Sequence, residues 1–245
     1  MEKAKVDYSA EREIVLKQIK ERSGIDYEQE LENIFNQLQR LGESTNPVKR
    51  ELRFVPPYFG KDDIKLIIIG QDPTIRNEER RKNITCTLNL DKSGALTSYV
   101  KQICEGLGIT IDNVFATNIF KYFYTTPPAQ TFDVLKKHLP YNLELLNKEL
   151  ELFPEAPVIT LGEPVLKLLT NDKAKVRVYW GYDSKTKSCN DNFNFVGTDD
   201  NNEIGRVFYP FCHQPSLRKH FYKDTLDLYT HYVIDSSSNG VHSSH

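Results

Sequence analysis

An uninterrupted apolar run, IKLIIIG at residues 64–70, restricts the fold more than any other stretch of this chain. A strand with one solvent-exposed face alternates apolar and polar residues, and this run does not alternate. It therefore predicts a strand buried on both faces, as in a parallel sheet covered by helices. Gln71, Asp72 and Pro73 follow at once, so an acid stands at the end of the strand that looks most buried.

Three further apolar runs, each followed by turn residues, predict the other strands. They are NVFATN at residues 113–118, PVITLG at 157–162 and RVFYPF at 206–211. Segments of helical periodicity lie between them, at 93–108, 131–153 and 163–172, and Pro140 is expected to break or restart the second of these. The alternation of strand and helix predicts an α/β, three-layer α-β-α fold around a central, mainly parallel four-stranded sheet.

Additional elements are predicted outside this core. Residues 9–24 and 26–42 have apolar residues at helical spacing and end near a glycine, which predicts two N-terminal helices. Residues 175–197 predict an inserted β-hairpin with a polar tip. We expect an N-terminal helical extension packed on the core at 1–50, an α/β domain at 51–235 and a disordered tail at 236–245.

Composition excludes some classes of protein and leaves others open. The formal net charge is −2, so the chain is not strongly basic, although a local basic patch can still bind nucleic acid. No apolar run approaches the ~20 residues of a membrane span. The four cysteines have no C-x-x-C pair, which favours reduced thiols over a four-cysteine metal cluster. We expect a protein that is cytoplasmic (nucleoid-associated) or nuclear and not secreted.

Polar side chains follow each predicted strand, where ligands of open α/β sheets bind. Asp72 follows the first, Asn118 the second, Glu163 the third and His213 the fourth. Each alone has an ordinary explanation as a cap or a surface residue. Together they predict an acid, an amide and an imidazole at one edge of the sheet.

These residues lie in motifs that resemble those of the uracil-DNA glycosylase superfamily. GQDPTIR resembles the family's GQDPYH motif, HQPSLRKHF its late HPSPLS loop, and VFATN its middle strand, which ends in an asparagine. The upstream stretch FVPPYFGKDDIKLIIIG resembles the lead-in to the first strand. The resemblance covers residues 53–232, and the motifs keep the family's order.

The resemblance implies roles for residues that would contact the target nucleotide. Asp72 matches the acid that positions a water and favours the cationic sugar, and His213 matches the histidine that hydrogen-bonds the base O2. Asn118 matches the asparagine that reads the Watson–Crick edge. Gln71, Thr74 and Thr87 are further candidates for the base pocket.

Other residues are implied to contact DNA. Leu217 matches the leucine that enters the duplex where the base leaves, and Ser216 is expected to touch phosphate. Pro73, Arg218 and Lys219 are further candidates. The charged stretch RNEERRK at 76–82 is either a phosphate-binding cluster or a solvated helix face.

The sequence also departs from the family pattern. Thr74 and Ile75 replace a tyrosine and a histidine, and that tyrosine blocks the methyl group of thymine. The stretch NITCTLNL offers Leu88 and its neighbours, but no aromatic residue, where the family has a phenylalanine that stacks on uracil. Phe120, Tyr122 and Phe123 are alternative stacking residues, although core packing is the favoured explanation for them.

Three hypotheses follow. The leading one is a metal-independent DNA glycosylase without a cofactor, a monomer that removes a flipped base from single- or double-stranded DNA in base excision repair. Uracil is the first choice, while hypoxanthine, xanthine, mismatched thymine and modified pyrimidines remain open. The second is a glycosylase-fold protein that binds DNA or a nucleotide without cleaving it. The third is an unrelated α/β protein in which GQDP occurs by chance.

Overall fold

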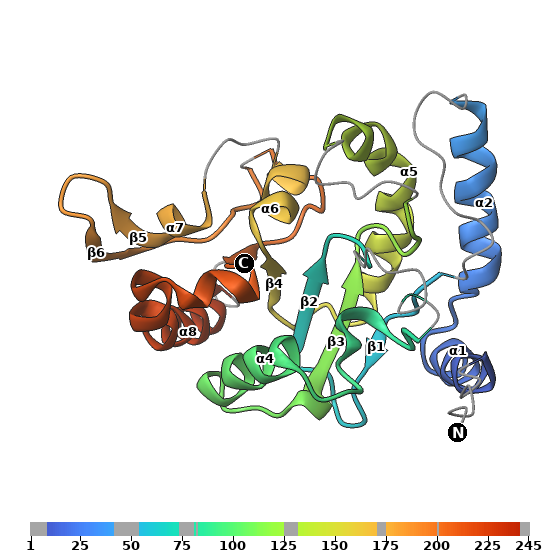
Figure 1. The fold of residues 1–245 in the computed structure, drawn as a ribbon, viewed down its shortest axis with the longest axis horizontal. Coiled ribbons are helices and arrows are strands. Elements are labelled where there is room, and N and C mark those ends of the chain that lie inside the picture. The colour runs from blue at the N-terminus through green and yellow to red at the C-terminus, as the bar shows by residue number, and fades with distance from the viewer. Residues whose placement is uncertain are drawn as a thin grey trace, which may run out of the picture.

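The computed structural model describes residues 9–41, 54–73, 81, 83–124, 132–170, 175–199 and 201–240. Its centre is a five-stranded sheet in the order β1-β3-β2-β4-β7 (Figure 1). The strands are β1 (Tyr58–Phe59), β2 (Leu66–Gly70), β3 (Val114–Asn118), β4 (Val158–Leu161) and β7 (Phe208–Phe211). None of the helices formed by the described residues is long and apolar enough to cross a membrane.

The four predicted strands are confirmed, and they run parallel to one another. β2 pairs with β3 on one side and β4 on the other, and β4 pairs with β7. The expected count of four is incomplete, because β1 adds an antiparallel edge strand beside β3. β1 has only two residues, too few for a detectable alternation of side chains.

Helices cover both faces of the sheet and make the predicted three layers (Figure 1). α4 and α8 contact each other on one face, whereas α5 contacts α2 and α6 on the other. The helices are α1 (Ser9–Ser23), α2 (Tyr27–Arg40), α4 (Ala95–Gly106), α5 (Phe132–Glu151), α6 (Glu163–Thr170), α7 (Val176–Tyr179) and α8 (His220–Gly240). Short 3-10 helices precede α4, β3 and α8, at Thr87–Asn89, Ile111–Asn113 and Gln214–Arg218.

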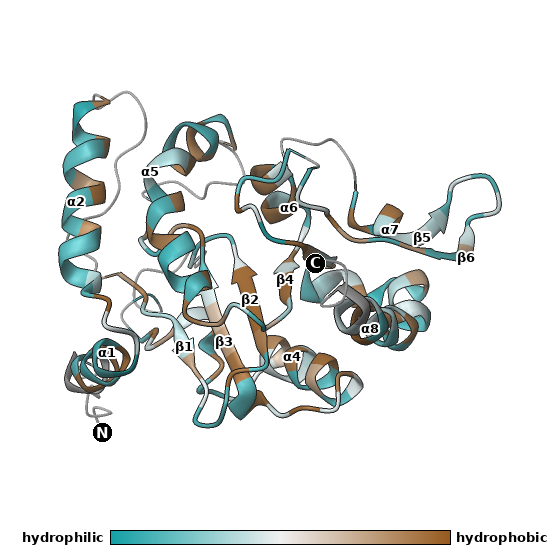
Figure 2. Cartoon of the chain, turned by 180° about the vertical axis from the view of Figure 1, so that it is seen from behind, coloured by the Kyte–Doolittle hydropathy of each residue, from teal (hydrophilic) through white to brown (hydrophobic). Residues whose placement is uncertain are grey.

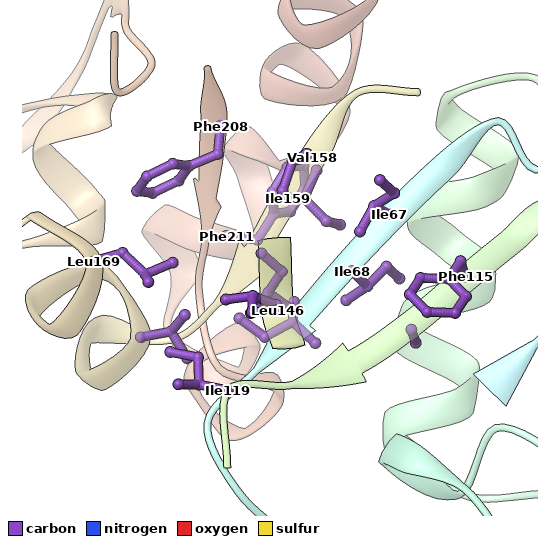
Figure 3. Close-up of a cluster of buried hydrophobic side chains, with 14 of the residues drawn as sticks. Ile67, Ile68, Phe115, Ile119, Leu146, Val158, Ile159, Leu169, Phe208 and Phe211 are labelled. Carbon is purple, nitrogen blue, oxygen red and sulfur yellow. The ribbon is translucent and has the colours of Figure 1, made fainter. Parts of the chain in front are cut away.

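The core lies between these layers, and β2 is at its centre. Every residue of β2 is buried, which explains its continuously apolar sequence (Figure 2). Ile67 and Ile68 lie among Phe115 of β3, Ile159 of β4 and Leu146 of α5 (Figure 3). Each fully buried side chain of this size contributes roughly 1.5–3 kcal/mol to folding, so the strand ends are firmly held.

Two helices differ from their prediction. α5 runs through Pro140 without a break, although the proline removes one backbone hydrogen bond. The Asn142 side chain donates to the His138 carbonyl across this turn at 2.9 Å. α8 continues to Gly240, so residues 236–240 are helical and not a disordered tail, and 241–245 lie outside the described residues. Ser236 anchors this end, since its hydroxyl donates to the Tyr209 hydroxyl at 3.0 Å.

The predicted hairpin begins later than expected. Residues Val176–Tyr179 form the short helix α7, and the antiparallel strands are β5 (Trp180–Asp183) and β6 (Ser188–Phe193). The hairpin extends away from the central sheet beside α8 (Figure 1). Trp180 at its base is fully buried, so this end belongs to the core.

Candidate active site at the carboxyl edge of the sheet

A cleft of about 610 Å³ opens where the four parallel strands end. Residues at or just after the ends of β2, β3, β4 and β7 all line it, including Asp72, Asn118, Glu163 and His213. These side chains are up to about 140 residues apart in sequence, and the parallel arrangement brings them to one edge. The convergence predicted from the strand ends is therefore present in the structure.

The main chain before Asp72 is fixed by the neighbouring strand. The Ile119 N–H donates to the Gly70 carbonyl, and the Phe120 N–H donates to the Gln71 carbonyl, both at 2.9 Å. The pairing of β2 with β3 thus continues past the strand ends, up to Gln71, the residue directly before the acid. This explains why an acid stands on a buried strand: the strand holds its position.

The Asp72 carboxylate lies near two buried phenols, Tyr122 and Tyr124. Burial raises the pKa of both phenols, and the negative charge of Asp72 raises them further. Both hydroxyls therefore stay neutral at pH 7 and add no second negative charge beside the acid. The phenols belong to a hydrogen-bonded group in which Asn142 donates to the Tyr122 hydroxyl and Tyr124 contacts His138 Nδ1, both at 3.0 Å.

Asn118 packs directly on Gly70. A Cβ atom at position 70 would lie 2.3 Å from Asn118 Oδ1, so any larger residue there would have to displace the amide. Asn118 is only 2% exposed, and none of the described residues donates a hydrogen bond to its Oδ1. Because buried polar atoms are normally paired, the amide is suited to a hydrogen bond with a ligand in the cleft.

Leu88 forms the wall beside Asn118 in a strained conformation. Its φ of 59° and ψ of 6° are left-handed, and Asn89 also has a positive φ. Such a conformation costs a side chain like leucine about 1–2 kcal/mol. Leu88 would lie 3.3 Å from a Cβ at Gly70, so an aliphatic side chain borders the asparagine.

His213 stands at the opposite side of the cleft, after β7. It caps the 3-10 helix Gln214–Arg218 and approaches Gly162, where a Cβ would lie 3.4 Å from His213 Cβ. Gly162 directly follows β4 and has a φ of +94°, which favours glycine. His213 is exposed at the cleft mouth, yet partial burial lowers its pKa. The imidazole is therefore neutral at pH 7, with one N–H donor.

The predicted DNA-contacting residues divide into two groups. Pro73, Ser216 and Lys219 line the cleft. Leu217 is half-buried and packs against the core, and Arg218 is exposed. Neither Leu217 nor Arg218 borders the cleft.

Some predicted residues are not brought to the cleft. Thr87 is fully buried and donates to the Pro56 carbonyl at 3.1 Å, so it supports a loop and does not face a base. Arg81 is buried, with its guanidinium 5.5 Å from the ring of Phe123. Thr74, Ile75, residues 76–80 and residue 82 lie outside the described residues.

The alternative stacking residues are core residues. Phe120, Tyr122 and Phe123 are at most 3% exposed, and none of them lines the cleft. Among the described residues that do line it, Tyr222 of α8 supplies a phenol ring. Sequence patterns gave no signal for Tyr222, since an aromatic residue on a helix normally indicates core packing.

The described residues offer no group of three His, Cys, Asp or Glu side chains that would hold a metal ion. The four cysteines are free thiols, and Cys86, Cys104 and Cys212 are buried. Burial raises the pKa of the Cys212 thiol to about 11, so Cys212, although it lines the cleft, is not a thiolate at pH 7.

The fold is that of an α/β protein with its cleft at the carboxyl ends of parallel strands, the place where open α/β sheets bind ligands. The sequence model of the Uracil DNA glycosylase superfamily matches residues 57–233. The chain therefore belongs to this superfamily, and membership indicates a glycosylase-like function and binding to DNA. A comparison with curated proteins gave no match. α1 and α2 lie outside the matched range.

Proposed function

We propose that the chain hydrolyses the N-glycosidic bond of a deaminated or modified base, with uracil as the first choice, in base excision repair. The observation that carries the proposal is one cleft bordered by Asp72, Asn118 and His213, each at the end of a different parallel strand. The target base must leave the stack to reach such a cleft, which costs a few kcal/mol.

The reaction separates charge, and the cleft supplies a group for each charge. As the bond between C1′ and the base nitrogen breaks, its electron pair goes to the base and the sugar becomes cationic. The Asp72 carboxylate would stabilise the cation and orient the water whose oxygen bonds to C1′. The proton that this water loses balances the one that the departing base anion takes up. The neutral His213 would donate to the base oxygen, where negative charge grows. Prearranged groups of this kind usually provide the largest part of catalysis.

Asn118 would select the base. Its buried carboxamide offers a donor and an acceptor in a fixed place, which suits the O4 and N3–H of uracil. Ser216 and Lys219 line the same cleft and would contact the phosphates that flank the extruded nucleotide.

Oligonucleotide cleavage tests the proposal. Duplex and single-stranded oligonucleotides with uracil, hypoxanthine, xanthine or a G·T mismatch are incubated with the protein, and alkali then cleaves any abasic site. We expect breaks at uracil, and a rate at least about 100-fold lower in Asp72→Ala and in His213→Ala. Breaks that persist in both variants would contradict the assigned roles.

A matched pair of glycine variants tests the Asn118 site. Gly70→Ala puts a methyl group against Asn118 Oδ1 and should abolish cleavage, whereas a Cβ at Gly94 meets nothing within 4 Å. Gly94→Ala should therefore cleave like the wild type. Equal activity of the two variants would remove Asn118 from the base site.

The second candidate function is binding without cleavage. It is favoured by Leu88, which borders Asn118 without offering a π face to a base. Under this alternative, the same oligonucleotides would shift in a gel and no substrate would give breaks.

A further inference from the structure

A buried carboxylate, Glu149 of α5, joins three parts of the molecule behind the cleft. Its Oε1 accepts from the Tyr27 hydroxyl of α2, and its Oε2 accepts from Thr117 of β3 and from Lys121, all at 2.9 Å. Glu149 is 0% exposed and Lys121 is 1% exposed. Taking two charges out of water is expensive, so such a pair needs every one of these hydrogen bonds.

The Glu149 network (Tyr27, Thr117, Lys121 and Glu149) ends on Asn118. The Lys121 ammonium donates to the Asn118 carbonyl at 3.0 Å as well as to Glu149. Thr117 precedes Asn118 in β3, so the two side chains point to opposite faces of the sheet. Glu149 therefore holds the end of β3 from behind, while the Asn118 amide faces Gly70 and the cleft.

Tyr27 is the contribution of the N-terminal helices. It is 2% exposed, lies outside the residues matched by the family, and its ring stacks on Phe54 with centroids 6.2 Å apart. Burial raises the pKa of Glu149, and the charge of Lys121 and the three hydrogen bonds oppose this. Loss of the Tyr27 hydroxyl would leave Oε1 without the donor that the structure gives it.

We infer that Tyr27, Glu149 and Lys121 are positioning residues for Asn118. Through Tyr27, the N-terminal helices thus help to hold the residue that reads the base. The inference rests on the proposed role of Asn118. It gives α2 a function that the matched family region does not contain: completing the hydrogen bonds that fix the end of β3.

Discrimination between two bases is the direct test. Two single-stranded oligonucleotides carry 2′-fluoro-2′-deoxyuridine or 2′-fluoro-2′-deoxycytidine, whose fluorine slows cleavage and whose bases differ only at the edge that Asn118 would read. The measured quantity is the ratio of the two dissociation constants. We expect wild type to prefer uracil, Asn118→Ala to lose the preference, and Tyr27→Phe to reduce it roughly fivefold, since it removes one hydrogen bond to a charged group.

A matched control breaks another link between the same two helices. Lys148 of α5 pairs with Glu30 of α2 at 2.9 Å near the surface, so Lys148→Met loosens α2 without touching Glu149. It should keep the wild-type ratio. A purely structural role for Tyr27 would weaken binding to both oligonucleotides equally and leave the ratio unchanged.

The outcomes separate the two proposals. A wild-type protein with equal affinity for both oligonucleotides would overturn the proposed base reading, and the inference with it. A wild-type preference that Tyr27→Phe retains in full would overturn the inference alone. Urea unfolding of each variant confirms that the measured proteins are folded.

Discussion

The N-terminal helices and the inserted hairpin both pack on the core, but different buried contacts accompany that packing. α2 buries Leu31, Ile34 and Leu38 in the core. It is also joined through the Glu149 network, which is made of hydrogen bonds and one ion pair. The hairpin is joined through an aromatic cluster (Trp180, Phe211, Tyr222 and Tyr229), in which Trp180 stacks on Tyr229 with centroids 4.8 Å apart. Trp180 and Tyr222 are in edge contact at 5.2 Å, so the cluster supports a wall of the cleft.

The difference concerns what each attachment can fix. Hydrogen bonds depend on distance and angle, so the polar network defines the place of one atom, the Asn118 carbonyl. Apolar burial is non-directional, so the aromatic cluster supplies stability and a surface. We therefore expect damage to the cluster to be seen first in stability, and damage to the network also in base discrimination.

A large loss of stability is expected for Trp180→Ala. The indole is fully buried, and its Nε1–H donates to the Pro210 carbonyl at 2.7 Å. Removing it should lower the free energy of unfolding by about 3–5 kcal/mol, measured by urea denaturation. Val178, two residues earlier and 54% exposed, provides the control, because Val178→Ala should change stability by less than about 0.5 kcal/mol. Similar losses in both variants would show that the cluster does not anchor the hairpin.

Removing one partner of the Lys121–Glu149 ion pair should destabilise the protein more than replacing both partners. Glu149→Leu leaves a buried lysine without its carboxylate, and Lys121→Met leaves the reverse, so each should lose about 3–5 kcal/mol in urea unfolding. The double variant should recover most of this loss, since both charges are gone. It should nevertheless discriminate uracil from cytosine poorly, because the donor to the Asn118 carbonyl is absent. A double variant with wild-type discrimination would make the network purely structural.

Acid sensitivity is expected at His138 of α5, a buried imidazole beside Tyr124. Burial lowers the pKa of His138 to about 4, and its Nε2 has no partner among the described residues. In the unfolded chain this pKa is about 6.5, so the unfolded state binds the proton more tightly. Stability is then complete above pH 6.5 and falls as the pH is lowered towards 4, by about 2 kcal/mol at pH 5.

The His138 contribution is measured as a difference between proteins, which cancels the other titrating groups. Urea unfolding at pH 7 and pH 5 should show a smaller acid loss in His138→Gln than in wild type. An equal acid loss in both proteins would place the sensitivity elsewhere.

Buried strands and the Glu149 network also differ in how well they could be predicted from the sequence. β2, β3, β4 and β7 were predictable because buried parallel strands leave apolar runs, and the motifs at their ends indicated Asp72, Asn118 and His213. The Glu149 network was not predictable. Glu149 lies in a helix beside other charged residues, and only the fold shows that it is 0% exposed.

Thr87 and Tyr222 show the limit at the cleft itself. The family resemblance predicts Thr87 in the base pocket, but in the 3-10 turn its hydroxyl donates to the Pro56 carbonyl. Tyr222 reaches the cleft because the hairpin packs against α8, a contact between segments with no shared pattern. Long-range packing determines the positions of both side chains, and no local sequence pattern indicates that packing.

Two tyrosines provide the smallest and sharpest comparison. Tyr27 and Tyr229 are both buried, and each hydroxyl donates one hydrogen bond of 2.9 Å, to Glu149 and to the Asn194 carbonyl respectively. Tyr229→Phe should lose about 1 kcal/mol in urea unfolding, somewhat less than Tyr27→Phe, whose acceptor is charged. Only Tyr27→Phe should change the ratio of dissociation constants for uracil and cytosine oligonucleotides. If Tyr229→Phe changed that ratio as much, the cluster would also position the base-reading residues, and the division between the two attachments would be wrong.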